Sequence, residues 1–114
     1  SYKLGGGGLC CSAEDLVRFS QALLAGGLVK KQTLDLMFMP GKLNDGTAID
    51  YALGFRVGKD GTRRVVAHGG AQSRVSTMLY ILPEQQVTVV LLCNLERMRL
   101  QQLAQAIARL VAAP

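Results

Sequence analysis

The chain has 114 residues, which suits one domain, and its 49% hydrophobic content argues against disorder. Only 5% of the residues are aromatic and none is Trp, so the core must be aliphatic. The formal net charge is +5, but the thirteen Lys and Arg form no stripe with interleaved aromatic residues. Net charge is the only feature that would suggest nucleic-acid binding, and we therefore expect no specific binding of this kind.

Cysteine and histidine usage gives no metal or disulfide pattern. Cys10 and Cys11 are adjacent and Cys93 lies in an apolar run, so the odd set of three indicates no disulfide framework. With His68 as the single histidine, no zinc-binding spacing exists, and we expect no metal and no cofactor. No apolar stretch is long enough to span a membrane. The chain starts without Met or a visible signal peptide, so we expect the native protein to extend upstream.

Two short helices are predicted in the first third of the chain. Ser12 can cap a helix whose apolar residues recur at helical spacing and which ends at Gly26-Gly27. These apolar residues are Leu16, Phe19 and Leu23. A second helix is expected from about Lys31 to Met39, where Pro40-Gly41 ends it.

Four antiparallel strands follow. Alternating apolar residues predict a strand from Tyr51 to about Val57, and a turn at Asp60-Gly61 leads into a return strand. We expect this return strand to cover Arg63 to His68 and to end at Gly69-Gly70. A third strand is expected from about Arg74 to Leu82. The fourth, Val87 to Cys93, is apolar on both faces and should be central or covered on both sides.

The last segment, from about Arg99 to Ala112, is predicted to be a helix lying across the sheet. Its expected inward stripe is Leu100, Leu103, Ile107, Leu110 and Val111. The fold class that follows is α+β, with an antiparallel β-sheet covered by a C-terminal helix and preceded by two short helices.

One position offers chemistry. His68 precedes two glycines, which leave the backbone bare, so that a ligand amide could pair there as an extra strand. The structural alternative is a tight turn into the next strand, which needs at most one glycine. The adjacent cysteines before the first helix have no base near them in sequence, so a catalytic thiol is not indicated.

Several motifs, in order and spacing, resemble the C-terminal part of the serine β-lactamase-related family, which includes class C β-lactamases, D,D-peptidases and related esterases. The similarity runs from about Gly7 to Ala112. It is carried by the segments Gly8 to Leu16, Tyr51 to Phe55, His68-Gly69-Gly70, and Pro83 with the strand ending at Cys93-Asn94. The resemblance implies that residues 1–114 are a single domain that is a C-terminal fragment of a larger β-lactamase-like domain with a penicillin-binding fold.

The resemblance also implies site residues. His68-Gly69-Gly70 matches the family's third motif, K-T-G or H-x-G. By analogy His68 would position a substrate carboxylate or the catalytic Tyr, Gly69 and Gly70 would leave room for the acyl group, and the backbone amide of Ala71 would be an oxyanion donor. Arg74 could hold a substrate carboxylate, or it could be a solvated charge at the strand end.

Two motifs of the family are missing from this chain. No Ser has Lys three residues on, and no Tyr has Asn two residues on. We therefore expect a portion of a serine hydrolase that acts on an ester, amide or β-lactam, carries the H-x-G wall and lacks the nucleophile, so that the 114 residues alone are inactive. The alternative is a non-catalytic pseudoenzyme or a ligand- or protein-interaction module. His in place of Lys favours an ester or amide without a carboxylate over a β-lactam.

The expected partner of the intact protein is a small-molecule acyl substrate. The family analogy favours a periplasmic or extracytoplasmic location, and a cytoplasmic one is left open. Because relatives add N-terminal strands to the same sheet, the edge beside Val87 to Cys93 should be bare in this chain and promote self-association.

Overall fold

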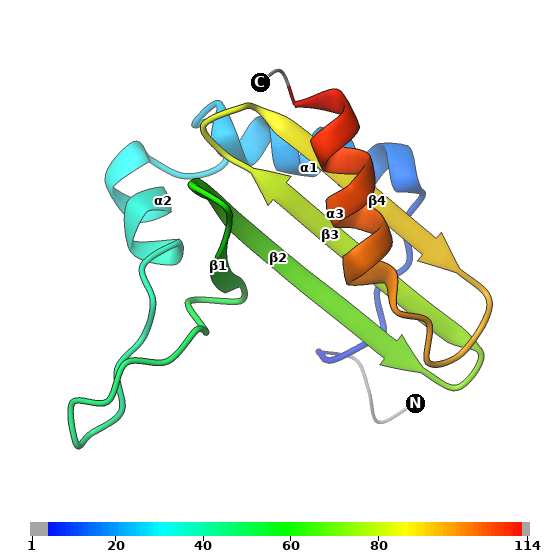
Figure 1. The fold of residues 1–114 in the computed structure, drawn as a ribbon, viewed down its shortest axis with the longest axis horizontal. Coiled ribbons are helices and arrows are strands. Elements are labelled where there is room, and N and C mark those ends of the chain that lie inside the picture. The colour runs from blue at the N-terminus through cyan, green and yellow to red at the C-terminus, as the bar shows by residue number, and fades with distance from the viewer. Residues whose placement is uncertain (1–4, 113–114) are drawn as a thin grey trace.

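The structure is a computed structural model, which describes residues 5–112. Its four strands form one antiparallel sheet in the order β1-β2-β3-β4, so each strand pairs with its sequence neighbours (Figure 1). The elements are α1 (Ala13–Leu24), α2 (Lys31–Met37), β1 (Arg56–Asp60), β2 (Arg63–Gln72), β3 (Val75–Leu82), β4 (Val87–Cys93) and α3 (Leu100–Val111). The α+β architecture predicted from the sequence is confirmed.

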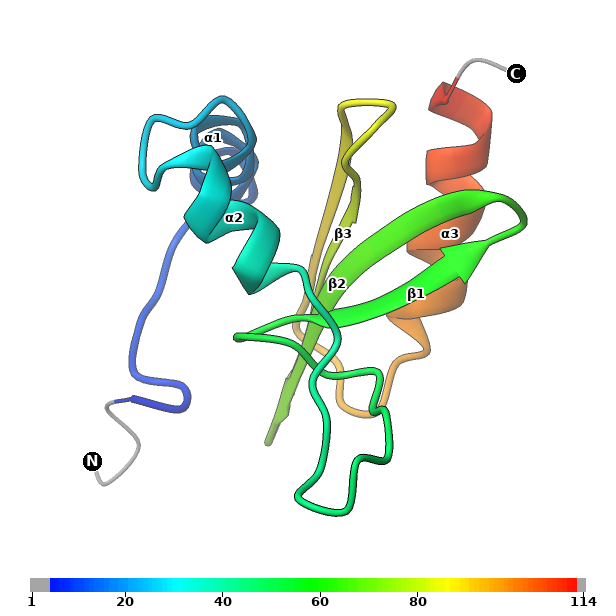
Figure 2. The same ribbon diagram turned by 90° about the vertical axis from the view of Figure 1, so that its left-hand side faces the viewer.

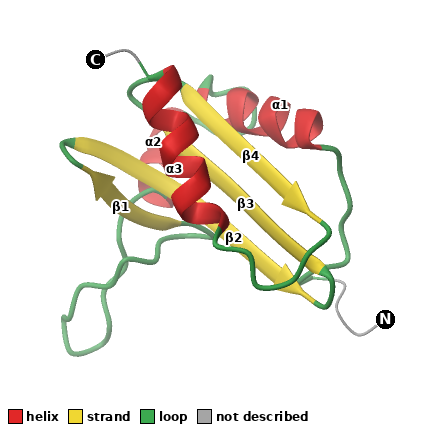
Figure 3. Ribbon diagram, turned by 45° about the vertical axis from the view of Figure 1, so that its right-hand side comes forward, coloured by secondary structure: helices red, strands yellow, loops and turns green. Residues whose placement is uncertain are grey.

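The sheet separates two helical layers. Figure 2 shows α1 and α2 on one face of the sheet and α3 on the other, and Figure 3 shows α3 lying across the strands. Both α1 and α3 contact β4, which explains why that strand is apolar on both faces. Among the described residues, no helix is long and apolar enough to cross a membrane.

The face that carries α1 and α2 buries an aliphatic and aromatic core. Its buried members are Leu23, Leu34, Phe38, Phe55, Val66, Leu79 and Ile81. The rings of Phe38 and Phe55 meet edge to face at a centroid distance of 5.3 Å. Ser12 caps α1 as predicted, with its side chain accepting from the amide of Asp15. These helices cover the half of β2 that contains Val66. The other half, residues 68–72, is exposed.

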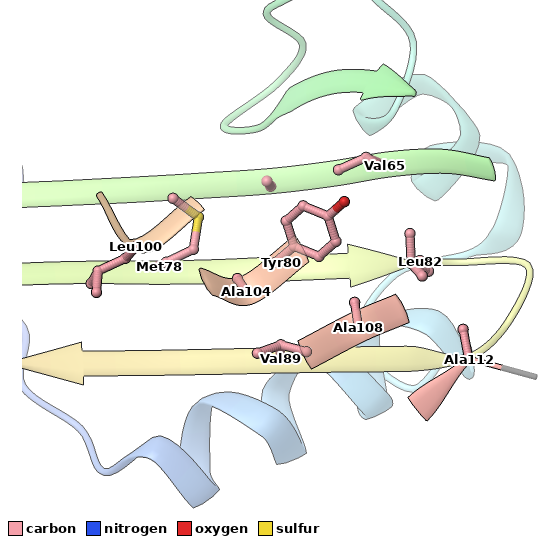
Figure 4. Close-up of a cluster of buried hydrophobic side chains, with 10 residues drawn as sticks. Val65, Met78, Tyr80, Leu82, Val89, Leu100, Ala104, Ala108 and Ala112 are labelled. Carbon is pink, nitrogen blue, oxygen red and sulfur yellow. The ribbon is translucent and has the colours of Figure 1, made fainter. Parts of the chain in front are cut away.

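The face under α3 differs from the prediction. The helix buries Leu100, Ala104 and Ala108 against the sheet, as Figure 4 shows. Leu103, Leu110 and Val111, which were predicted to face the sheet, are 51%, 88% and 64% exposed. The sheet contributes large side chains to this core, those of Met78, Tyr80 and Leu82. The helix therefore packs against them largely through small alanine side chains.

A buried carboxylate fastens α3 to the β1–β2 hairpin. Asp60, at the end of β1, accepts hydrogen bonds from Gln105 Nε2 at 2.9 Å and from Arg109 Nε at 2.9 Å. The Arg109 hydrogen bonds, followed by that of Gln105, lower the pKa of Asp60 to about 2. Sequence alone indicated only a turn residue here, because its partners lie 45 and 49 residues away.

Candidate active site

The strand that carries His68 does not end at the glycines, which corrects the prediction. β2 continues to Gln72, and Gly69, Gly70 and Ala71 pair with Met78, Thr77 and Ser76 of β3. Neither glycine has a positive φ, so the pair is extended backbone and not a turn. The glycines therefore lie within the strand, and His68 lies near its middle.

Gly70 is needed for close packing. A Cβ built on Gly70 would lie 2.5 Å from Oγ1 of Thr77, which no real structure tolerates without movement. A Cβ on Gly69 would lie 3.1 Å from Cε of Met78, the mobile end of a flexible side chain. Sterics therefore require glycine at position 70 more strictly than at position 69.

Beyond Ala67, one edge of β2 is open. The register of β1 with β2 runs from Asp60 opposite Arg63 to Arg56 opposite Ala67 and then stops. Within residues 5–112, no strand pairs with residues 68–72 on that side. These five residues are all exposed, whereas Val65, Val66 and Ala67 are buried. The open edge of residues 68–72 is the candidate site.

The direction of the backbone amides decides what this edge presents. The N–H of Val57 donates to the carbonyl of Asp50, away from β2, so the amides of its neighbours Arg56 and Gly58 face β2. Arg56 is opposite Ala67, whose amide therefore points to β1. Amides alternate along a strand, so those of Gly69 and Ala71 point to the same edge, where no strand follows. Among residues 5–112 the Ala71 amide has no backbone acceptor on this side, so it has the free N–H that the predicted oxyanion donor needs.

The side chain of His68 lies beside Tyr51. Nε2 of His68 lies 3.2 Å from the hydroxyl of Tyr51, and the ring centroids are 6.3 Å apart. Both residues are exposed, with Tyr51 at 38%. Side chains alternate between the faces of a strand, so His68 shares the face of Val66, on which α1 and α2 pack.

Sequence reasoning missed this contact because it predicted a continuous strand from Tyr51. In that case the observed register would place Tyr51 opposite Gln72. Instead, the chain reverses between Ala52 and Phe55, where the Ala52 N–H donates to the Phe55 carbonyl at 2.7 Å. Gly54 in this reversal has φ +82, which favours glycine. The Leu53-Gly54 pair was the available signal for a break in the strand.

Arg74 lies apart from the imidazole. It is the second residue of the two-residue turn between β2 and β3, with φ +64. Its backbone N–H donates to Oε1 of Glu96 at 2.7 Å, and the Ser73 hydroxyl donates to the same oxygen at 3.1 Å. The structure gives the exposed Arg74 side chain no contact with His68, so its substrate-binding role stays a prediction.

Hollows lie on both faces of the open edge. One of about 400 Å³ is lined by Gly70, Ala71 and Gln72 together with the N-terminal segment around Gly6 and Cys10. Another, of about 640 Å³, lies between Gly69, Ala71 and the first turn of α3. The described residues contain no cluster of three or more side chains that would hold a metal ion.

Comparison with known proteins shows the family of the chain. A family model described as Beta-lactamase matches residues 1–112. The chain belongs to the β-lactamase family. It is also similar to penicillin-binding protein 4* of Bacillus subtilis (strain 168), with 32% identity over 93 residues that cover 81% of this chain and 21% of that protein. The chain thus spans about a fifth of the length of the curated relative it matches.

Membership of the β-lactamase family confirms the resemblance inferred from the motifs. The H-x-G match, His68-Gly69-Gly70, lies within the matched region, on the open half of β2. The roles of His68, Gly69, Gly70 and Ala71 toward a substrate stay predictions.

Proposed function

We propose that this chain is the portion of a β-lactamase-like serine hydrolase that carries the H-x-G strand of the active site. The intact protein would cleave an ester, amide or β-lactam of a small molecule through an acyl-enzyme. The observation that carries the proposal is the open edge of β2, where the Gly69 and Ala71 amides face no strand and His68 stands beside them. Family membership supports the reaction class.

Each residue of the edge has a part in this proposal. The Ala71 N–H donates to the oxyanion that forms when the acyl carbonyl is attacked, and such a donor is typically worth about 2.7–4 kcal/mol of barrier. The Gly69 backbone pairs with an amide of the substrate as an added strand would. Gly70 keeps the strand against Thr77, and His68 contacts the substrate or the catalytic tyrosine.

The nucleophile comes from outside these 114 residues. No serine in the chain has a lysine three positions later, so the chain holds no Ser–Lys pair of the S-x-x-K kind. Without that pair no acyl-enzyme forms. The 114-residue chain by itself should therefore show no turnover and no labelling by a fluorescent penicillin.

Histidine at the first position of the motif bears on the substrate class. An imidazole lacks the permanent charge of lysine near neutral pH, so it anchors a carboxylate less well. The proposal therefore favours an ester or amide without that carboxylate. Arg74 is the alternative carboxylate anchor, and its place in the turn at the end of β2 leaves it exposed.

The test uses the full-length protein with a chromogenic ester and a chromogenic β-lactam. His68→Ala should lower kcat/KM for the true substrate by about tenfold or more. The control is Lys59→Ala, which removes an exposed side chain of β1 away from the open edge. If His68→Ala leaves every activity unchanged, His68 is not part of the site. If the full-length protein neither turns over nor becomes acylated, the non-catalytic alternative holds.

A further inference from the structure

The hydrogen bonding of the His68 imidazole is asymmetric. Nε2 lies 3.2 Å from the Tyr51 hydroxyl, and within residues 5–112 the structure gives Nδ1 no partner. A neutral imidazole has one donor and one acceptor nitrogen, and the partner of one nitrogen selects the tautomer. The contact with Tyr51 therefore determines what the free nitrogen can offer.

The chemistry of the two groups sets the direction of this bond. A phenol O–H is a stronger donor than a neutral imidazole N–H, and the bare imidazole nitrogen is a stronger acceptor than the phenol oxygen. The Tyr51 hydroxyl then donates to Nε2, which leaves the proton on Nδ1. In this tautomer the free side of the His68 ring presents an N–H donor.

We propose that Tyr51 is a positioning residue that holds His68 as the Nδ1–H tautomer, so that His68 acts as a neutral hydrogen-bond donor to an oxygen of the substrate. This inference rests on the proposed function. It deepens that function by assigning His68 a donor role and by giving Tyr51 a part that sequence reasoning did not find. A donor of this kind suits the carbonyl or ester oxygen of an uncharged acyl group.

Tyr51 is well placed to impose this geometry because both its backbone and its ring have partners. Its backbone forms an antiparallel bridge with Arg56. The Arg56 guanidinium lies 5.6 Å from the centroid of the Tyr51 ring and is held by Asp50 at 3.1 Å. The neighbouring residues Ala52 and Phe55 are 9% and 7% exposed, so the reversal that carries Tyr51 is anchored in the core.

The first test reads the tautomer directly and needs no activity. His68 is the only histidine of the chain, so a ¹⁵N-histidine sample gives one pair of ring resonances. At a pH that keeps the imidazole neutral, wild type should show the proton on Nδ1. Tyr51→Phe, which keeps the ring and removes the hydroxyl, should shift the resonances toward the Nε2–H form. Tyr80→Phe is the matched control, because Tyr80 lies under α3 on the other face of the sheet.

The outcomes of this first test are distinct. A Nδ1–H signal that moves in Tyr51→Phe and does not move in Tyr80→Phe supports the proposal. A Nε2–H signal in wild type, or no change in Tyr51→Phe, overturns it. Retention of the backbone amide spectrum outside residues 51 and 68 establishes that the variant is folded, and Arg56→Gln, which leaves the hydroxyl and loosens the ring, should give an intermediate shift.

The second test measures kinetics in the full-length protein and separates this inference from the proposed function. Tyr51→Phe should lower kcat by about tenfold with little change in KM, which corresponds to about 1.36 kcal/mol at the transition state. If His68→Ala abolishes activity and Tyr51→Phe changes neither tautomer nor kcat, the positioning role is wrong and the proposed function stands. If Tyr51→Phe moves the tautomer but His68→Ala leaves activity intact, His68 is not part of the site and its donor role toward the substrate is wrong. If the full-length protein shows neither turnover nor acylation, the proposed function itself fails.

Discussion

Gly70 and Thr77 share a space that admits only one side chain, since a Cβ on Gly70 would lie 2.5 Å from the Thr77 Oγ1. The two residues are opposite each other in the β2–β3 register, at the centre of the open half of β2. The glycine is thus required by a residue of the neighbouring strand. This link between the candidate site and β3 can be tested without a substrate.

Gly70→Ala should destabilise the chain by about 1–3 kcal/mol, because the added methyl overpacks against Thr77. Thr77→Ala removes Oγ1 and should restore most of that loss in the double variant, whereas Thr77→Val keeps a γ atom and should not. Gly69→Ala is the matched control and should cost less, since Cε of Met78 can move. Urea unfolding measures each difference. Equal losses for Gly69→Ala and Gly70→Ala would contradict the steric explanation.

Acid should loosen the attachment of α3. The pKa of Asp60 in the folded chain is about 2, below the ordinary value near 3.9 of an unfolded chain. A lowered pKa means that the carboxylate stabilises the fold above the unfolded value. This contribution is lost as the pH falls from about 4 through about 2.

Asp60→Asn should therefore lower the free energy of unfolding at neutral pH and flatten its pH dependence across this window. Arg109 and Gln105 would lose the charged acceptor that they share. Asp35→Asn, on an exposed carboxylate of α2 that lies 3.6 Å from Lys31, controls for the loss of any negative charge. Urea titrations at several pH values give the comparison. A pH profile of Asp60→Asn that matches wild type would rule out the attachment.

The packing of α3 predicts that substitution at a buried alanine of the helix lowers stability, whereas substitution at an exposed leucine does not. Ala104 is fully buried against the sheet, so Ala104→Leu should cost about 1–3 kcal/mol through overpacking. Leu110 is 88% exposed, so Leu110→Ala should change stability by less than about 0.5 kcal/mol. Chemical denaturation of the two variants and of wild type distinguishes this arrangement from the leucine-facing one that the sequence suggested.

Self-association through β4 stays a prediction that the structure makes concrete. Within residues 5–112, β4 pairs with β3 alone, so its outer edge has free backbone groups. The sedimentation coefficient of the 114-residue chain should rise with concentration. Leu92→Lys, at an exposed position of β4, should reduce this rise, and Leu103→Lys on α3 is the control. A monodisperse monomer at high concentration in wild type would contradict the prediction.

Local signals made much of the fold predictable. The cap at Ser12 and the bounds of β4 follow from chemistry within a few residues, and both were predicted correctly. The inward face of α3 was not predictable in the same way, because it depends on which side chains of the sheet, Tyr80 among them, the helix packs against. An apolar stripe does not reveal which of its members meet large partners.

The candidate site also has features that the sequence predicted and features that depend on pairing with other strands. Family motifs pointed to His68 and Ala71, and the structure puts the Ala71 amide on an open edge. The continuation of β2 through its glycines is set by pairing with Met78 and Thr77, which no local pattern of β2 contains. The Tyr51 contact likewise depends on the reversal at Gly54. The Leu53-Gly54 pair signals a break in the strand, but only the fold brings Tyr51 beside His68.

Beyond Ala67, and within residues 5–112, β2 pairs with β3 alone, so the outer half of the strand is held by backbone pairing on one side only. Its free end is the Ser73-Arg74 turn, and one carboxylate oxygen of Glu96 holds both residues of that turn. A hairpin whose turn is held by hydrogen bonds moves less than one whose turn is free. Glu96 lies outside the strands, and we expect its hold on this turn to limit the movement of the strand that carries the Ala71 amide.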